Sequence, residues 1–263
     1  MMRGMSSQTV AVTPFGAALR RRRLARGTSQ LALAHLAQTT SRHVSFLETG
    51  RSRPSRDMVA RLAQALDLPS RESNDLFRVA GLAPAFPETP LEADDLAPFT
   101  SVVERMLAGH DPYPAYAIDR HWNIVRTNSA AELFLPNAEE RNVVRLTYAG
   151  SWRPMIANWS DIAWAGIRRL QVEAARRPEE EVLAELVELA TEACRGIPDR
   201  PGTDGARVLC PHFRIGDALV RTMTVVAQFG GALDVTLEEL RVELIYPADG
   251  EADAVFQSMA ALR

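Results

Sequence analysis

The stretch TSQLALAHLAQTTSRHVSFLETGRSRPS, residues 28–55, decides the fold of the first part of this chain. It predicts two short helices joined by a tight turn. The first helix starts at Ser29, because a serine side chain can accept hydrogen bonds from the free N–H groups of a first helical turn. The second covers 40–49, and apolar residues at helical spacing face inward from both helices: Leu33, Ala34, Leu36, Val44 and Leu47. This arrangement is typical of a helix-turn-helix, whose second helix lies in the major groove of DNA.

The second of these helices carries the side chains that are expected to contact DNA. Thr40, Ser41, Arg42 and Ser45 share its outward face. Arginine can bind guanine through two hydrogen bonds, whereas serine and threonine discriminate less between bases. Gln30 opens the preceding helix, where a side chain and a helix N-terminus together can hold a phosphate.

Arginines surround this motif. Four of them, at 20–23, lie on the predicted helix 14–25, and they can contact phosphates or form a solvated charged face. Further helices are expected after Ser55 and after Pro69, so that five helices fill residues 13–81, behind a disordered leader at 1–12. The predicted DNA-binding set is completed by Arg20, Arg51 and Arg53.

Charge divides the chain unevenly. Residues 1–80 hold 13 Arg against 5 acidic residues, whereas the rest holds 17 Arg against 28, so the net charges are +8 and −11. Phosphate attraction depends on local positive charge, which points to a polyanion as the partner of the first part alone. All 30 basic residues are arginine, which is better explained by coding bias than by selection for phosphate contacts.

A family resemblance rests on residues distributed across 15–55: Phe15, Gly16, Leu19, Arg20, Arg23, Ser29, Gln30, Leu33, Ala34, Ser41, Val44, Ser45, Leu47, Glu48, Gly50, Arg51, Pro54 and Ser55. Together they resemble the Cro/phage-repressor (XRE) helix-turn-helix. The resemblance implies a buried ion pair between Arg23 and Glu48, a phosphate contact at Gln30, and a recognition surface at Ser41, Arg42 and Ser45.

Two departures from the XRE pattern are visible. Gln38 stands where the family usually has a turn glycine, so a non-glycine residue with positive φ is expected there. Leu31 and Ala32 replace the paired acids that usually occupy this helix. Neither departure removes a predicted DNA contact.

Prolines at 84, 87, 90 and 98 predict a linker without regular structure at 82–98. Beyond it, the patterns predict an α+β, PAS-like domain of about five antiparallel strands with inserted helices at 99–263, which can enclose a small molecule. The expected strands are 115–119, 122–127, 207–215, 218–229 and 240–246, and the expected helices are 99–108, 129–135, 158–176, 178–195 and 251–262.

A second resemblance lies in this part, at residues 114–123 and 128–131, at the helical block with Trp159, and at 228–230, 234–236, 239–240 and 247–249. These segments are similar to the MmyB-like ligand-binding domain, which in its family follows an XRE helix-turn-helix. The resemblance implies a transcriptional regulator and a long-chain fatty acid as the class of ligand. Thr127 departs from it, because the family tends to have tryptophan there.

Aromatic and apolar side chains are the candidates for a ligand pocket, although ordinary core packing is the default explanation for any single one of them. Asn128 is better explained as a helix N-cap. A carboxylate head group would find its partner among Arg126, Arg153 and Arg221. The predicted ligand-binding set is Tyr116, Trp122, Asn128, Phe134, Trp152, Trp159, Met223, Val225 and Phe229.

Other classes of function find little support. No nucleophile elbow, phosphate loop, paired catalytic acids or metal-ligand spacing is present, so no catalytic or metal-ligating residue and no cofactor is predicted, apart from a bound fatty acid. Two cysteines do not make a disulfide framework, and no apolar run is long enough to span a bilayer, which favours a cytoplasmic protein without a membrane partner.

The leading hypothesis is therefore a ligand-responsive regulator that binds double-stranded DNA as a homodimer on two half-sites. The alternative keeps DNA binding but makes the second domain a ligand-free dimerisation or protein-interaction module. A packed domain core without a cavity would favour that alternative.

Overall fold

The computed structural model of the protein describes residues 13–135, 139–177, 180–199 and 210–262. The predicted leader at 1–12 and the start of the strand expected at 207–215 lie outside this range. The chain forms two compact units. The head comprises the residues up to Thr89 together with Gly231–Glu238, and the body comprises Pro90–Gly230 together with the residues from Glu239 onward.

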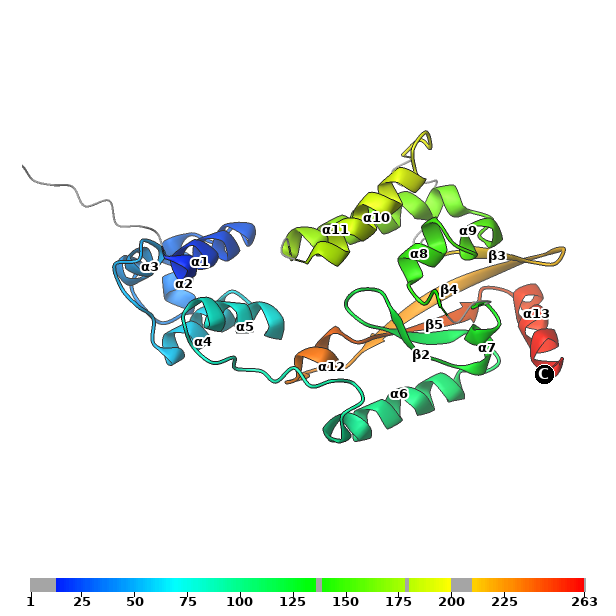
Figure 1. The fold of residues 1–263 in the computed structure, drawn as a ribbon, viewed down its shortest axis with the longest axis horizontal. Helices are drawn as coiled ribbons and strands as arrows, with labels where there is room; N and C mark the ends of the chain where they lie inside the picture. The colour runs from blue at the N-terminus through cyan, green and yellow to red at the C-terminus, as the bar shows by residue number, and fades with distance from the viewer. Residues whose placement is uncertain (1–12, 136–138, 178–179, 200–209, 263) are drawn as a thin grey trace, which may run out of the picture. The chain divides into compact units, whose positions relative to one another are not determined.

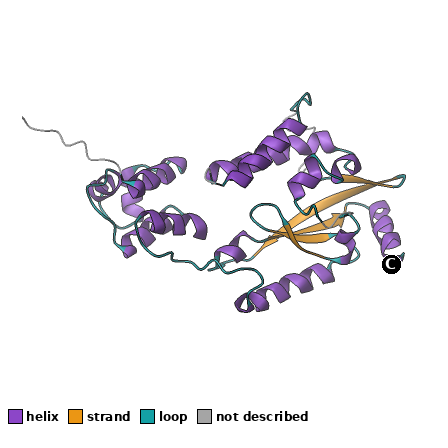
Figure 2. Ribbon diagram, viewed as in Figure 1, coloured by secondary structure: helices purple, strands orange, loops and turns teal. Residues whose placement is uncertain are grey.

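The head is an all-α domain of the predicted five-helix type (Figures 1 and 2). Four of its helices begin where a Ser or Thr side chain accepts a hydrogen bond from an N–H group of the first turn: Thr13, Ser29, Thr40 and Ser55. Such caps satisfy backbone donors that have no partner within the helix. The helices are α1 (Pro14–Ala25), α2 (Gln30–Leu36), α3 (Ser41–Glu48), α4 (Arg56–Ala65) and α5 (Ser70–Val79).

The turn between α2 and α3 confirms the backbone geometry that the sequence predicted. Gln38 has φ of 49°, in the left-handed region that glycine occupies more readily than other residues. Close packing elsewhere in the head requires a true glycine. A Cβ atom at Gly16 of α1 would lie 2.5 Å from the carbonyl oxygen of Glu48, so α1 and the end of α3 approach too closely for any side chain.

The segment Gly231–Glu238 belongs to the head, although it is far from the head helices in sequence. It holds most of the short helix α12 (Val235–Glu239). The α5 N-cap, Pro69, offers no side-chain acceptor, and the Glu238 carboxylate instead accepts a hydrogen bond from the N–H of Ser70 at 2.8 Å. Asp234 likewise accepts from the N–H of Thr89 at 3.2 Å. The sequence patterns did not predict that Gly231–Glu238 belongs to the head.

The body is built on a five-stranded antiparallel sheet with the order β2-β1-β5-β4-β3. The strands fall within the predicted ranges, at β1 (Ala115–Ile118), β2 (Ile124–Thr127), β3 (His212–Ile215) and β4 (Ala218–Gln228), and β5 extends to Pro247 (Arg241–Pro247). Each strand alternates its side chains between the two faces of the sheet. The fold is thus the predicted α+β, PAS-like class.

Helices cover both faces of this sheet (Figure 1). On one face, Val103 and Leu107 of α6 pack against Ala115, Ala117 and Val242. On the other face, Tyr116, Ile118 and Ile245 belong to a larger core built with the helices that follow the first hairpin. These helices are α7 (Ser129–Glu132), α8 (Val143–Tyr148), α9 (Trp152–Met155), α10 (Trp159–Arg176) and α11 (Glu181–Ala193), and α13 (Gly250–Ala261) closes the chain.

The predicted linker requires a correction at its end. A 3₁₀ turn, η1, forms at Asp94–Leu96, and α6 (Ala97–Gly109) starts inside the predicted linker rather than at residue 99. Pro98 lies in the first turn of α6, where the missing N–H of proline would have no helical partner in any case. The short helices α8, α9 and α12 were not predicted either.

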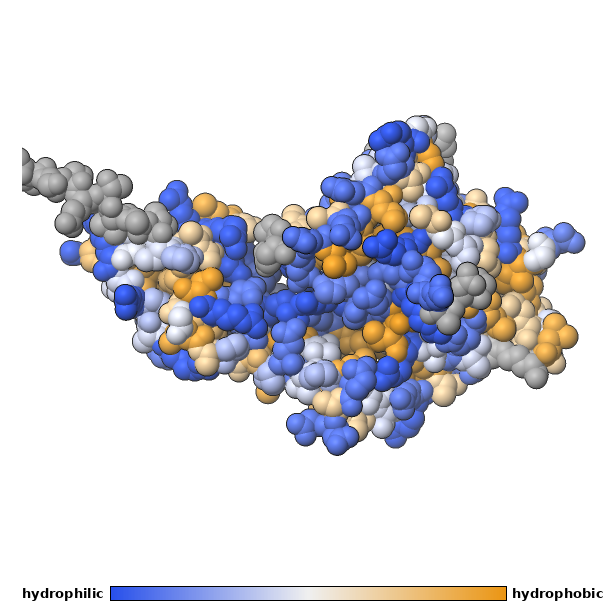
Figure 3. All heavy atoms as spheres, in the orientation of Figure 1, coloured by the Kyte–Doolittle hydropathy of each residue, from blue (hydrophilic) through white to orange (hydrophobic). Residues whose placement is uncertain are grey.

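The surface of the body in the view of Figure 3 is largely hydrophilic, with apolar side chains gathered in smaller areas. Within the described parts of the chain, no helix is long and apolar enough to cross a membrane.

Candidate functional site

The helix α3 presents a polar face to solvent. Ser41 and Arg42 are exposed and Ser45 is half-buried, whereas Val44 and Leu47 are fully buried in the head core. The hydroxyl oxygen of Thr40 accepts a hydrogen bond from the N–H of His43 at 3.1 Å, so this predicted contact residue also serves as the α3 N-cap. The predicted recognition residues therefore share one accessible face.

Two arginines lie near the aromatic ring of Phe46 in α3. The guanidinium of Arg42 lies 5.2 Å from the ring centre of Phe46, and that of Arg51 lies 5.9 Å from the same ring. Cations are attracted to the faces of aromatic rings at such distances. Both guanidinium groups thus lie near the Phe46 ring of α3. Its role was not predicted from the sequence.

The four arginines of α1 have two different environments. Arg20 and Arg21 are exposed, whereas Arg22 and Arg23 are buried in the head. Arg22 lies 3.5 Å from a carboxylate oxygen of Asp75, which explains its burial. Only the first pair is therefore placed to reach a phosphate, and Arg53 is exposed as well.

Arg23, Glu48 and Gln30 form one hydrogen-bonded cluster. Arg23 donates to both carboxylate oxygens of Glu48, from Nε at 2.6 Å and from Nη2 at 3.0 Å, and Gln30 Nε2 donates to Glu48 Oε2 at 2.7 Å. Burial raises the pKa of Glu48, but the hydrogen bonds from Arg23 and Gln30, with the charges of Arg23 and Arg20, outweigh it and leave the pKa below its ordinary value. The amide of Gln30, predicted to hold a phosphate, is thus engaged inside the head.

The body contains a cavity of about 330 Å³ between the sheet and α8–α10. Three of the predicted ligand-binding residues line it: Tyr116, Trp122 and Trp152. Most of the remaining wall is apolar and comes from Val143, Val144, Ile156, Ile162, Leu170, Phe213, Val226 and Ile245. Ligand sites typically have such mainly apolar walls with a few polar groups. Phe134 lines a much smaller neighbouring void of about 10 Å³.

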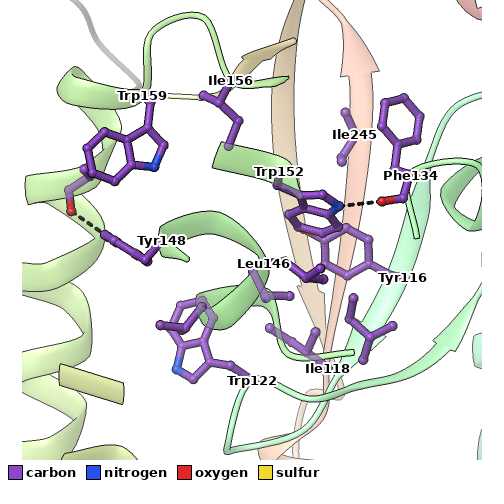
Figure 4. Packing of buried hydrophobic residues seen from close by; sticks show 14 of the residues in the cluster. Tyr116, Ile118, Trp122, Phe134, Leu146, Tyr148, Trp152, Ile156, Trp159 and Ile245 are labelled. Carbon is purple, nitrogen blue, oxygen red and sulfur yellow. Dashed lines mark hydrogen bonds between the residues drawn. The ribbon is translucent and has the colours of Figure 1, made fainter. Parts of the chain in front are cut away.

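Hydrogen bonds fix the aromatic side chains around the cavity (Figure 4). The indole N–H of Trp152 donates to the carbonyl of Phe134 at 2.6 Å, and the hydroxyl of Tyr148 donates to the carbonyl of Ala163 at 2.6 Å. The indole N–H of Trp159 donates to the carbonyl of Thr147 at 2.7 Å. These polar atoms are satisfied by the backbone, so the rings present apolar surface to their surroundings.

Besides Phe134, five residues of the predicted ligand-binding set are not part of the described cavity wall. Trp159 packs into the core, and Asn128 caps α7 by accepting from the N–H of Ala131 at 3.0 Å. Met223 and Val225 alternate in β4 with Thr224 and Val226, and the latter two line the cavity. Because neighbours in a strand point to opposite faces, Met223 and Val225 point away from the cavity. Phe229 follows β4 and packs on the α6 side, with its ring centre 5.9 Å from that of Phe99.

Part of the cavity wall is polar. The hydroxyl of Tyr116 donates to Glu243 Oε2 at 2.8 Å, and both residues are buried. Burial, followed by the nearby carboxylate, raises the pKa of Tyr116 well above its ordinary value, so the hydroxyl keeps its proton and remains a donor. Glu243 was not predicted as a site residue, because an acid that alternates with apolar residues in a strand is expected to face solvent.

Among the described residues of the cavity wall, the arginine is Arg169. It lies at the rim with 43% of its side chain exposed, and its guanidinium is 4.6 Å from the ring centre of Trp122. Arg241 lies 4.4 Å from the same ring, and Glu173 accepts a hydrogen bond from its Nη1 at 2.8 Å. The arginines proposed from the sequence as carboxylate partners, at 126, 153 and 221, are absent from the described cavity wall.

Protein-family models match both the head and the body of the chain. A model described as "MmyB-like transcription regulator ligand binding domain" matches residues 100–259, and one described as "Helix-turn-helix domain" matches residues 14–76. The first match covers more than half of the chain. The protein is an XRE-type helix-turn-helix regulator with a PAS-like ligand-binding domain. It belongs to the family of MmyB-like transcription regulators.

Two solved structures are similar to short parts of the chain. The restriction-modification controller protein C.AhdI from Aeromonas hydrophila is 39% identical and covers 22% of this chain and 89% of its own, with a TM-score of 0.22. The clp gene regulator ClgR from C. glutamicum is 30% identical over 26% of this chain and 83% of its own, with a TM-score of 0.23. No curated relative matches the sequence. In the described residues, no group of His, Cys, Asp and Glu could hold a metal ion.

Proposed function

We propose that this regulator binds DNA through α3 and changes its DNA affinity when an apolar small molecule occupies the body cavity. The observation that carries the proposal is the 330 Å³ cavity with mainly apolar walls in the domain that matches the ligand-binding family. Its volume lies within the range of small-molecule sites, roughly 300–1,000 Å³. Because the domain is hollow, the alternative of a ligand-free interaction module has less support.

On the DNA side, the exposed face of α3 enters the major groove, with Arg42 and Ser41 at base edges and Arg20, Arg51 and Arg53 at phosphates. The proposed assembly is a homodimer on two half-sites. Losing Arg42 should weaken specific binding by about 1–3 kcal/mol and relax the sequence preference. A phosphate contact such as Arg53 should affect all sequences alike and reduce the salt dependence.

The DNA claim is tested by selecting preferred sites from a random duplex library with the full-length protein and then comparing variants. Arg42→Ala should lose affinity and change the selected sequence, whereas Arg105→Ala, an exposed arginine of α6, serves as the matched control. Unchanged affinity and preference in Arg42→Ala would show that α3 is not the recognition helix. Sedimentation of the bound species then measures the stoichiometry.

On the ligand side, the proposed class is a long-chain fatty acid. Its chain would fill the apolar cavity, and its carboxylate would meet Arg169 at the rim, where a guanidinium can form two parallel hydrogen bonds. Native mass spectrometry of the freshly purified protein, compared with the denatured chain mass, tests this. A bound species of fatty-acid mass supports the proposal. A bare chain, unchanged after incubation with long-chain acids, shifts the weight to the interaction module.

A further inference from the structure

A buried carboxylate forms part of the cavity wall. Glu243 is 7% exposed, and its Oε2 accepts the hydrogen bond from Tyr116. Among the described residues, no hydrogen-bond partner contacts its other oxygen, Oε1. Burying a carboxylate is costly unless hydrogen bonds satisfy it. This oxygen therefore offers an acceptor to whatever fills the cavity.

Neither neighbouring arginine is bonded to Glu243, although Nε and Nη2 of Arg241 are buried without a hydrogen-bond partner among the described residues. Arg169 stacks on Trp122 and its Nε lies 3.4 Å from Glu173, and the Nη1 of Arg241 donates to the same carboxylate. Register explains why Glu243 nevertheless faces the cavity: it pairs with Val226 of β4, another wall residue, and alternates with Val242 and Leu244 on the α6 face. The pairing of β5 with β4 therefore places the Glu243 carboxylate in the cavity wall.

Arg169 and Glu243 are both wall residues of the cavity. Arg169 lies over the same Trp122 ring as Arg241, which is two residues from Glu243 in β5 and therefore on the same face of the sheet. A ligand carboxylate against Glu243 would place two like charges together in an apolar site, which is unfavourable. A neutral hydroxyl there would donate to the free oxygen, while the ligand carboxylate would suit the half-exposed Arg169.

We propose that the cavity selects long-chain acids that carry a hydroxyl group close to the carboxyl end, with the hydroxyl donating to Glu243 and the carboxylate held by Arg169. The inference rests on the proposed function, because it names the ligand class within the same cavity. It also distinguishes this chain's preferred ligand from an unmodified fatty acid, which cannot donate a hydrogen bond from its chain to Glu243.

Three probes of equal chain length test the inference on the full-length protein: hexadecanoic acid, β-hydroxyhexadecanoic acid and ω-hydroxyhexadecanoic acid. Titration calorimetry gives the affinities. A hydrogen bond to a charged group contributes enough to tighten binding about tenfold or more. The β-hydroxy acid should therefore bind at least about tenfold more tightly than the other two. The ω-hydroxy acid controls for polarity, because its hydroxyl lies at the far end of the chain.

Two variants locate the effect. Glu243→Leu combined with Tyr116→Phe removes both partners of the buried hydrogen bond, so neither is left unpaired, and should abolish the preference for the β-hydroxy acid. Glu243→Gln keeps an acceptor and should retain a smaller preference. Glu188→Gln, an exposed acid of α11, should behave like wild type. Tryptophan fluorescence verifies that the body of each variant is folded.

The outcomes separate the two proposals. Equal affinity for all three acids in the wild-type protein overturns the selection by Glu243 and leaves the fatty-acid cavity standing. A preference that persists in the double variant also overturns it. If none of the three acids binds, both the ligand class and the proposed ligand-responsive function are wrong.

Discussion

Replacing Glu48 by alanine should destabilise the head and leave the body intact. The side chains of Arg23 and Glu48 are only 8% and 3% exposed. Alanine at 48 leaves the Arg23 guanidinium buried without its carboxylate and removes the acceptor of Gln30. Removing one partner from a buried ion pair costs about 3–5 kcal/mol, because an uncompensated charge remains.

That cost is large for a domain of this size. Folded domains are stable by about 5–15 kcal/mol, and small domains lie toward the lower end. Three hydrogen bonds are lost at once, two from Arg23 and one from Gln30, whereas the bond from Arg23 Nη1 to the carbonyl of Thr28 at 2.8 Å survives. The Glu48→Ala head should therefore lose most of its margin of stability.

The assay uses the uneven distribution of tryptophan. All four tryptophans lie in the body, at positions 122, 152, 159 and 164, so fluorescence follows body unfolding alone. Circular dichroism in a urea titration follows the helices of both units. Glu48→Ala should move the head transition to lower urea and leave the fluorescence transition in place.

A double variant separates burial from charge. Arg23→Met with Glu48→Leu replaces the pair by apolar side chains, which is often neutral for stability, and should recover at least half of the loss. A loss below about 1 kcal/mol in Glu48→Ala would mean that the pair behaves like an exposed salt bridge. The reasoning from burial would then be refuted.

Two further predictions concern the same contact between α1 and α3. The folded-state pKa of Glu48 lies below its ordinary value of 4.5, since the hydrogen bonds from Arg23 and Gln30 and the charges of Arg23 and Arg20 outweigh the opposing effect of burial. The stabilisation that ionised Glu48 gives the head is therefore present above the unfolded pKa and is lost as pH falls through the folded pKa. The urea midpoint of the head should drop when the pH falls below 4.5. In Glu48→Gln the drop should be smaller. Gly16→Ala should cost about 1–3 kcal/mol, measured in the same titration, because its Cβ would meet the Glu48 carbonyl, whereas Gly109→Ala, with open space around it, should be nearly neutral.

The head could be predicted from the sequence because its signals are local. Caps at Ser29 and Ser55, helical spacing of apolar residues and the length of the turn at Gln38 all act within a few residues of each other. The contribution of Gly231–Glu238 could not be predicted. Its Glu238 caps α5 from 168 positions away, and no local pattern records so distant a hydrogen bond.

The ligand cavity shows where pattern reasoning reaches its limit. In β4 the alternation was evident, yet the apolar face with Met223 and Val225 points away from the cavity. The usual rule assigns the apolar face of a strand to the core and the polar face to water. In β4 the apolar residues Met223 and Val225 are 52% and 50% exposed, whereas Thr224 and Val226 line the cavity. Alternation therefore defines two sides of the strand without saying which one holds a ligand.

The polar pair in the cavity wall follows from pairing between strands that are distant in sequence. Glu243 meets Tyr116 because β5 pairs with β1 in the register that places these two residues opposite each other. A shift of one residue would turn Glu243 toward α6 and bring Val242 or Leu244 to the cavity. Residue types alone give no such register. The acid that distinguishes this cavity from a purely apolar one could therefore be recognised only once the sheet was known.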